Sequence, residues 1–183
     1  MTNDTTNPTG GSVSATDLAT GHWVLDPAGS SVGFRHKSLW GLVTVRGTFA
    51  TVTGEGQVHT GGRGEGTLVI DATSVDTKKK RLDVHLRSAD FFEVDRHPTI
   101  VFAADGVIAD STGNAEVSGV LTVRGKSRPL TFTAQVTAAS ATDVTLTGEV
   151  GVDYKDFGLP WKNPGGTMRG ITTVTLRTRF TRA

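Results

Sequence analysis

Apolar and polar side chains alternate in Val144-Thr145-Leu146-Thr147-Gly148-Glu149-Val150-Gly151-Val152-Asp153-Tyr154. The apolar residues fall on even positions and the polar ones on odd positions, a period of two that is typical of a β-strand with one buried and one solvated face. The same alternation returns on both sides of this stretch. It predicts further strands near residues 32–36, 43–49, 68–72, 100–108, 117–123, 130–136 and 174–180, and a short one at residues 23–25.

The composition favours the same fold class. Thr, Gly and Val are the three commonest residue types, and β-branched residues suit the pleated surface of a sheet. The 183 residues suffice for one domain with a sizeable core. No run approaches the roughly 20 apolar residues of a membrane-spanning helix. We therefore expect one all-β domain over residues 22–183, preceded by a polar, flexible tail at residues 1–21.

The charge and the residue inventory exclude several classes of protein. The 19 Lys and Arg residues against 18 Asp and Glu give a net charge of +1, without the positive excess of a non-specific nucleic-acid binder. The chain has no Cys, which excludes disulfides, thiol catalysis and thiolate metal sites. Residues 1–21 carry neither Lys, Arg nor an apolar run, unlike a secretory signal, so we expect a cytoplasmic location.

Short turn sequences separate the strands, at residues 26–29, 54–56, 61–64, 110–114 and 124–127. Short connections make neighbouring strands antiparallel. Eight antiparallel strands can close into a barrel, which removes exposed strand edges and leaves an interior for side chains or one small ligand. We therefore predict an all-β, eight-stranded antiparallel barrel. A sandwich of two sheets is the alternative.

One segment, near residues 77–92, has a helical period instead. Its apolar face is formed at spacings of three and four residues by Leu82, His85, Leu86 and Ala89. Asp76 or Thr77 is placed to cap the first turn, and Pro98 restarts the strand pattern. We expect one helix near a mouth of the barrel, with His85 on its inner face.

Five motifs stand out beyond the periodicity: Ser31-Val32-Gly33-Phe34-Arg35-His36-Lys37, Val45-Arg46-Gly47-Thr48-Phe49, His85-Leu86-Arg87-Ser88-Ala89-Asp90-Phe91-Phe92, Gly119-Val120-Leu121-Thr122-Val123-Arg124-Gly125 and Phe157-Gly158-Leu159-Pro160-Trp161. Together they resemble the YceI-like family, which is described as lipocalin-like, over about everything after Trp23. The resemblance implies an antiparallel barrel around an elongated apolar cavity that holds a polyisoprenoid or another long-chain lipid. It implies neither a catalytic activity nor a cofactor, and it allows a homodimer.

The chain departs from the family pattern at two positions. Many relatives carry Arg-Asp directly before the residue that precedes the helical His, whereas this chain has Leu82 before Asp83 and its arginine one place earlier, at Arg81. One residue turns a helix by about 100°. Relatives also often have Arg where this chain has Tyr154. Any contact that those arginines make with a headgroup therefore does not transfer directly.

The expected ligand is a long-chain lipid. Its tail is expected to lie against the apolar face of the strands, along Phe34, Phe49, Phe102, Phe132 and Val152. Its polar end is expected near His36, Arg81, His85 or Tyr154. Val45, Ile70, Leu86, Phe91, Val150, Phe157 and Trp161 complete the candidate set. Alternatively, the aromatic rings fill the interior as a packed core. Small residues on the same parity, such as Ala104 and Ala134, favour an open lumen.

His36 shares the parity of Val32 and Phe34, so its ring is expected to point inward. It is either paired with a neighbouring strand or bound to a ligand headgroup. No two histidines lie at a short metal-ligand spacing, and no Gly-x-Ser-x-Gly elbow is present, so we predict neither a metal site nor an enzyme. The alternatives are an enzyme that acts on a lipid with His36 or His85 as general base, and an interaction module without a ligand.

Two further features have two interpretations each. The basic run Lys78-Lys79-Lys80-Arg81 is either a solvated face or a surface for transient contact with an anionic membrane. The connection at residues 157–166 carries Phe157, Leu159 and Trp161 among Gly and Pro residues. It either plugs one end of the barrel or forms a hydrophobic lip through which the lipid enters.

Overall fold

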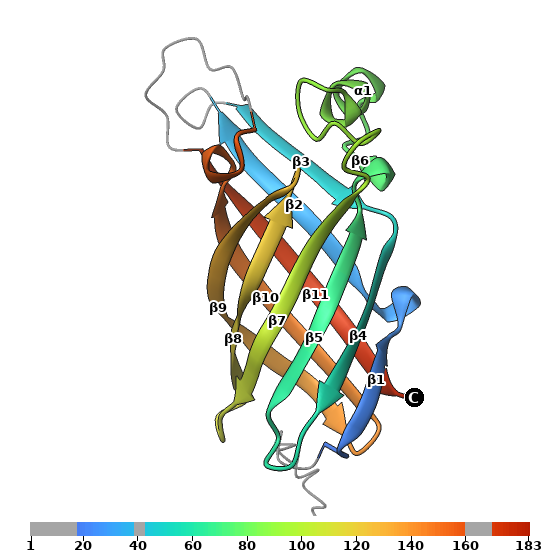
Figure 1. Ribbon diagram of the computed structural model, residues 1–183, viewed down its shortest axis with the longest axis vertical. Coiled ribbons are helices and arrows are strands. Elements are labelled where there is room, and N and C mark those ends of the chain that lie inside the picture. Colours follow the sequence, from blue (N-terminus) through green and yellow to red (C-terminus); the bar gives the residue numbers. More distant parts are fainter. Residues whose placement is uncertain (1–17, 39–42, 160–169) are drawn as a thin grey trace, which may run out of the picture.

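The chain forms a β-barrel with one α-helix at its upper end (Figure 1). A computed structural model describes residues 18–38, 43–159 and 170–183. Its strands are β1 (Gly21–Leu25), β2 (Ser31–Ser38), β3 (Val43–Phe49), β4 (Val52–Val58), β5 (Gly64–Asp71), β6 (Val75–Asp76), β7 (Thr99–Ala109), β8 (Asn114–Val123), β9 (Lys126–Ser140), β10 (Asp143–Asp153) and β11 (Ile171–Arg182). The helix is α1 (Lys80–Arg87), and short 3-10 helices are η2 (Pro27–Gly29), η4 (Ala72–Ser74) and η5 (Tyr154–Phe157).

Eight strands close the barrel. The order β1-β4-β5-β7-β8-β9-β10-β11 is antiparallel throughout, and β11 returns to β1, with Phe180 opposite Leu25. The other half of β11 pairs with β2, which continues through β3 to β6 at the upper end. The predicted all-β, eight-stranded antiparallel barrel is therefore confirmed, and the alternative of a sandwich is wrong.

Strand β4 corrects the sequence-based interpretation of Gly54-Glu55-Gly56 as a turn. Both glycines lie within β4 and face β5. A Cβ atom on Gly54 would lie 2.8 Å from the Thr67 carbonyl oxygen, and one on Gly56 would lie 2.8 Å from that of Glu65. The glycines therefore allow the two backbones to approach closely, which is the other common reason for glycine inside a strand.

The helix is shorter than the predicted segment of residues 77–92. α1 begins after Lys79, which provides no side-chain cap, so the prediction that Asp76 or Thr77 caps it is wrong. Instead, the backbone N–H and the hydroxyl of Thr77 donate to Asp83 Oδ1, at 2.8 and 2.6 Å. These bonds turn the Asp83 side chain inward and satisfy it in a buried position.

The residues just before β1 contact the barrel. Ala19 donates a backbone hydrogen bond to Ala141, and the indole N–H of Trp23 donates to the Ala19 carbonyl at 3.0 Å. Residues 1–17 lie outside the described residues, and the division into a tail and a barrel domain stays a prediction. Within the described part of the chain, no helix has the length and apolar character needed to cross a membrane.

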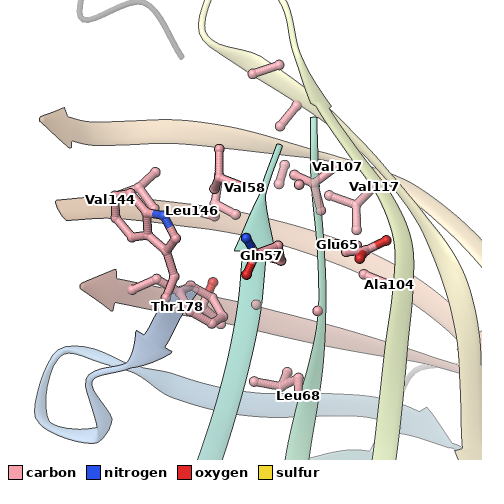
Figure 2. Close-up of a pocket in the computed structure, with 18 of the residues that line it drawn as sticks. Gln57, Val58, Glu65, Leu68, Ala104, Val107, Val117, Val144, Leu146 and Thr178 are labelled. Carbon is pink, nitrogen blue, oxygen red and sulfur yellow. The ribbon is translucent and has the colours of Figure 1, made fainter. Parts of the chain in front are cut away.

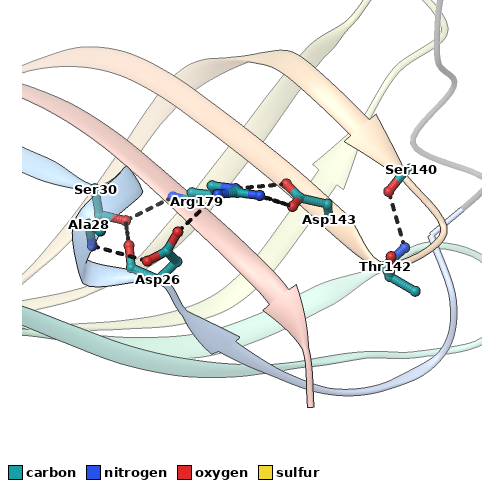
Figure 3. Close-up of polar contacts among 7 residues, drawn as sticks. All are labelled: Asp26, Ala28, Ser30, Ser140, Thr142, Asp143 and Arg179. Atoms are coloured by element: carbon teal, nitrogen blue, oxygen red, sulfur yellow. Dashed lines mark hydrogen bonds and ion pairs between the residues drawn. The ribbon is translucent and has the colours of Figure 1, made fainter.

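Arg179 on β11 stabilises the connection between β1 and β2, which is formed by η2 (Figure 3). Its guanidinium donates to Asp26 Oδ2 at 3.0 Å and to Asp143 Oδ2 at 3.1 Å, and its backbone N–H donates to Ser30 Oγ at 2.9 Å. The hydrogen bond from Arg179 holds the pKa of Asp143 below its ordinary value. One side chain thus ties η2 to β10 and β11.

Candidate functional site

The barrel encloses two apolar chambers, each with a cavity volume of about 150 Å³. A cavity of this size elsewhere stays dry and holds a benzene-sized molecule. The upper chamber lies at the α1 end and the lower chamber at the β1 end. Most residues predicted to contact the lipid line the upper chamber: Phe34, His36, Val45, Phe49, Ile70, Leu86, Phe91, Phe102, Phe132, Val150, Val152, Tyr154 and Phe157.

Four side chains line both chambers: Leu68, Phe102, Phe132 and Leu176. The rings of Phe102 and Phe132 lie with their centroids 5.9 Å apart. We call these four residues the waist. These four residues form the boundary that the two chambers share, and the two cavities show that the aromatic rings do not fill the whole interior.

The polar side chains that line the upper chamber are His36, Tyr154 and Thr172, and they lie together. His36 is 4% exposed, and its Nδ1 lies 3.1 Å from Thr172 Oγ1. The Tyr154 ring meets the His36 ring edge to face, with centroids 5.4 Å apart. The inward orientation predicted for His36 is therefore confirmed, and the ring has a structural partner on β11.

Both ionisable rings of this cluster are held uncharged near neutral pH. Burial lowers the pKa of His36, although a hydrogen bond with the Ile171 backbone partly offsets the effect. Burial also raises the pKa of Tyr154, and the charge of Asp153 adds to that shift. Desolvation disfavours the charged form of each group. The cluster thus presents uncharged hydrogen-bonding groups to an otherwise apolar chamber.

Two buried aromatic segments cover the upper end of the lumen. Phe91 and Phe92 follow α1, and their rings meet edge to face with centroids 4.8 Å apart. Phe157 and Leu159, in and just after η5, are buried from the other side. This burial supports the interpretation of residues 157–159 as part of a plug. Trp161 and the rest of the 157–166 connection lie outside the described residues.

The model of the YceI-like domain matches residues 23–181, which is nearly the whole described barrel. The chain belongs to the YceI-like family. It is 27% identical over 146 residues to a UPF0312 protein of Vibrio cholerae, covering 75% of this chain and 77% of the relative. A UPF0312 protein of Ectopseudomonas mendocina is 31% identical over 111 residues, covering 61% of this chain and 49% of the relative.

Solved structures share the fold of this YceI-like chain. BcnA of Burkholderia cenocepacia superposes with a TM-score of 0.75 at 19% identity, covering 85% of this chain and 98% of BcnA. A polyisoprenoid binding domain from Saccharophagus degradans gives a TM-score of 0.68 at 19% identity, covering 88% of this chain and 98% of that domain. At these identities the likeness establishes a common fold.

Arg81 and His85 of this YceI-like chain lie outside both chamber linings, and both are exposed. The prediction that His85 faces inward is therefore wrong. The helix begins three residues later than the predicted segment, and the bonds from Thr77 to Asp83 turn Asp83 and Leu86 toward the barrel. The His85 ring lies beside that of Phe91, with centroids 6.3 Å apart.

The sequence did not reveal the lower chamber as a separate part of the YceI-like lumen. Figure 2 shows it surrounded by side chains from most strands of the barrel, among them Val58, Val107, Val117, Val144 and Leu146. Trp23, 2% exposed, also lines it. In the sequence, the sign of this chamber is the set of small residues at inward-facing strand positions. Ala104 and Ala134 are two of them, and both line the chamber. The described residues hold no group of three side chains suited to a metal ion.

Proposed function

We propose that the protein binds one long-chain lipid, a polyisoprenoid, lengthwise in the lumen. The observation that carries this proposal is the pair of apolar chambers that meet at the waist, with His36, Tyr154 and Thr172 gathered in the upper one. The fold shared with a polyisoprenoid binding domain from Saccharophagus degradans supports it. Each buried methylene contributes about 0.8 kcal/mol, so a chain that fills both chambers offsets the cost of association.

The polar end of this lipid is placed in the upper chamber, beside His36, Thr172 and Tyr154. Neutral imidazole, hydroxyl and phenol groups form hydrogen bonds with an alcohol or a carbonyl. They supply no positive charge for a pyrophosphate, which is usually recognised by Arg, Lys or a metal ion. We therefore propose a prenol or a prenylated quinone as the class of ligand. The sixteen candidate residues remain predictions as contacts with this ligand.

Binding, without turnover, is the proposed activity. His36 is paired with Thr172, and among the described residues that line the upper chamber none carries a carboxylate that could orient the imidazole as a general base. Incubation of the purified protein with geranylgeraniol, followed by lipid extraction, should return the same compound. A product that accumulates with repeated turnover would instead establish the alternative of an enzyme.

Sequestration or transport of the lipid is the proposed role of binding, with transient contact at a membrane surface. Lys78, Lys79, Lys80 and Arg81 are all exposed, and Lys78 also forms an ion pair with Asp76. A cluster of cations attracts anionic headgroups. We expect replacement of all four cations by Gln to slow uptake of geranylgeraniol from anionic vesicles but not from neutral ones. Unchanged uptake from anionic vesicles would contradict the membrane contact.

Native mass spectrometry of freshly purified protein, followed by extraction and identification of the dissociated compound, tests the proposed function. A stoichiometric isoprenoid adduct is the expected result. A uniform mass of the free protein, unchanged after incubation with farnesol, geranylgeraniol and solanesol, would contradict it and favour an interaction module. The cytoplasmic location and the homodimer remain predictions, to be tested by cell fractionation and by analytical ultracentrifugation.

A further inference from the structure

The wall of the barrel is interrupted between β9 and β10. The two strands pair from Ser140 opposite Asp143 to Ala134 opposite Gly148, and their pairing ends there. Beyond that point β9 continues as residues 126–133, paired only with β8, and β10 continues as residues 149–153, paired only with β11. We call the gap between these two strand edges the seam. It is defined by described residues on both sides.

Local sequence features account for the separation. The register shifts between Thr145 and Leu146, where β9 places an extra residue, Thr137, in the ladder. Such a bulge bends a strand and increases its twist. Pro129, on the part of β9 that is not paired with β10, has no backbone N–H to donate, and proline is tolerated in sheets mainly at edges. Both features favour divergence of β9 from β10 above the bulge.

The seam borders the upper chamber. Leu130 and Phe132 of one edge and Val150 and Val152 of the other all line that chamber. Since side chains alternate along a strand, the intervening Thr131 and Gly151 face outward, and both positions are exposed. Apolar side chains that line the chamber therefore lie directly behind the two strand edges that border the seam.

The upper end of the barrel offers a less direct route. Leu86, Phe91 and Phe92 cover it from one side and Phe157 and Leu159 from the other, and all five are buried. η5 directly follows β10 and contacts β9, so it bounds the seam from above. Passage at the top would displace this packed cover, whereas passage at the seam breaks no hydrogen bonds between the two strands.

We propose that the lipid chain enters and leaves the upper chamber sideways, through the seam between β9 and β10. This inference rests on the proposed function, because it requires a lipid in the lumen. The seam is the entry site for an extended hydrocarbon chain. Passage between two paired strands of the wall would break backbone hydrogen bonds, at about 1 kcal/mol per bond.

A removable cross-link across the seam tests the inference. The chain has no Cys, so Thr131→Cys and Gly151→Cys can be joined selectively with a short bis-maleimide that contains a reducible disulfide. Continuation of the β9–β10 register would place these two residues opposite each other. A Cβ on Gly151 would lie 3.2 Å from the Cγ2 methyl of the exposed Ile171 side chain. The matched control joins Gly151→Cys to Thr173→Cys, its paired neighbour on β11.

Stopped-flow fluorescence of parinaric acid, a polyene fatty acid that brightens in an apolar site, reports the rate of entry. We expect the seam cross-link to slow entry by about tenfold or more, as for binding that requires a conformational change, and reduction to restore it. The β10–β11 cross-link should leave the rate unchanged. Entry at the same rate in both linked proteins would overturn the proposed entry route but not the proposed function. If the unlinked protein binds neither parinaric acid nor geranylgeraniol, the proposed function and the proposed entry route are both overturned.

Discussion

Phe102 on β7 and Phe132 on β9 hold their rings against each other inside the barrel, with centroids 5.9 Å apart and planes inclined by 50°. Both side chains line the upper and the lower chamber. A chain that occupies both chambers must therefore pass these rings. If the proposed lipid fills both chambers, we expect the waist to limit the thickness of the chain that passes it.

A charge at the waist should abolish binding. Phe132→Asp places a carboxylate among hydrocarbon side chains, where an unpaired charge is costly next to a lipid tail. We expect a folded barrel, judged by circular dichroism, that has lost its lipid adduct in native mass spectrometry. Thr133→Asp, at the exposed neighbouring position, is the control and should retain the adduct. Full retention by folded Phe132→Asp would place the ligand outside this lumen.

A larger side chain in the lower chamber should select against long ligands. Ala104 lines that chamber, so Ala104→Leu occupies space that the far end of the chain would fill. Loss of two methylenes from the buried part of a ligand costs about 1.6 kcal/mol, or roughly tenfold in affinity. We expect this loss for solanesol and a smaller loss for farnesol, in competition with parinaric acid. Ala103→Leu, on the exposed side of β7, should affect neither compound.

The polar cluster should distinguish an alcohol from a hydrocarbon. Thr172→Val keeps the shape of the side chain but removes the hydroxyl that lies 3.1 Å from His36 Nδ1. One lost hydrogen bond is worth about 1 kcal/mol, so the affinity for a prenol should fall about fivefold. Squalene, which has no polar end, should bind equally well to both proteins. Equal losses for the two ligands would indicate a change in chamber shape instead.

His36 should make the folded state sensitive to mild acid. Burial lowers its pKa in the folded protein, so the unfolded chain binds a proton at a higher pH than the folded one. The stabilisation is present above the unfolded pKa and is lost as the pH falls toward the folded value. We expect the Tm to decrease between about pH 7 and pH 5. In His36→Gln this decrease should be smaller, and an identical decrease in both proteins would contradict the assignment.

The strand period predicted the lining of the upper chamber because it fixes which side chains share a face. Phe34, Phe49 and Val152 follow directly from that parity, and each lines the chamber. The prediction for α1 was less successful because a helical face depends on where the helix begins. The bonds from Thr77 to Asp83 connect residues outside and inside the helix, and the spacing of apolar residues does not reveal them.

Two features could not be derived from the sequence: strand β4, which contains two glycines, and the lower chamber, which is lined by alanines. Glycine is common in turns and also where two strands approach closely. The sequence Gly54-Glu55-Gly56 therefore indicates a turn, although both glycines lie within β4. Ala104 and Ala134 indicated space on the inward face. They could not indicate that the space forms a second chamber, because this depends on which strands lie opposite one another in the closed barrel.

Arg179 should contribute stability that depends on pH. Arg179→Met removes the guanidinium from Asp26 and Asp143 but keeps the apolar stem. The pKa of Asp143 is lowered in the folded protein, so its contribution is present above the unfolded pKa and is lost as the pH falls through the folded one. We therefore expect a lower Tm for Arg179→Met at neutral pH and a smaller difference at acidic pH, where Asp143 becomes protonated. Arg177→Met, exposed on the same strand, is the control. A Tm difference of the same size at both pH values would attribute the effect to packing of the side chain and not to its charge.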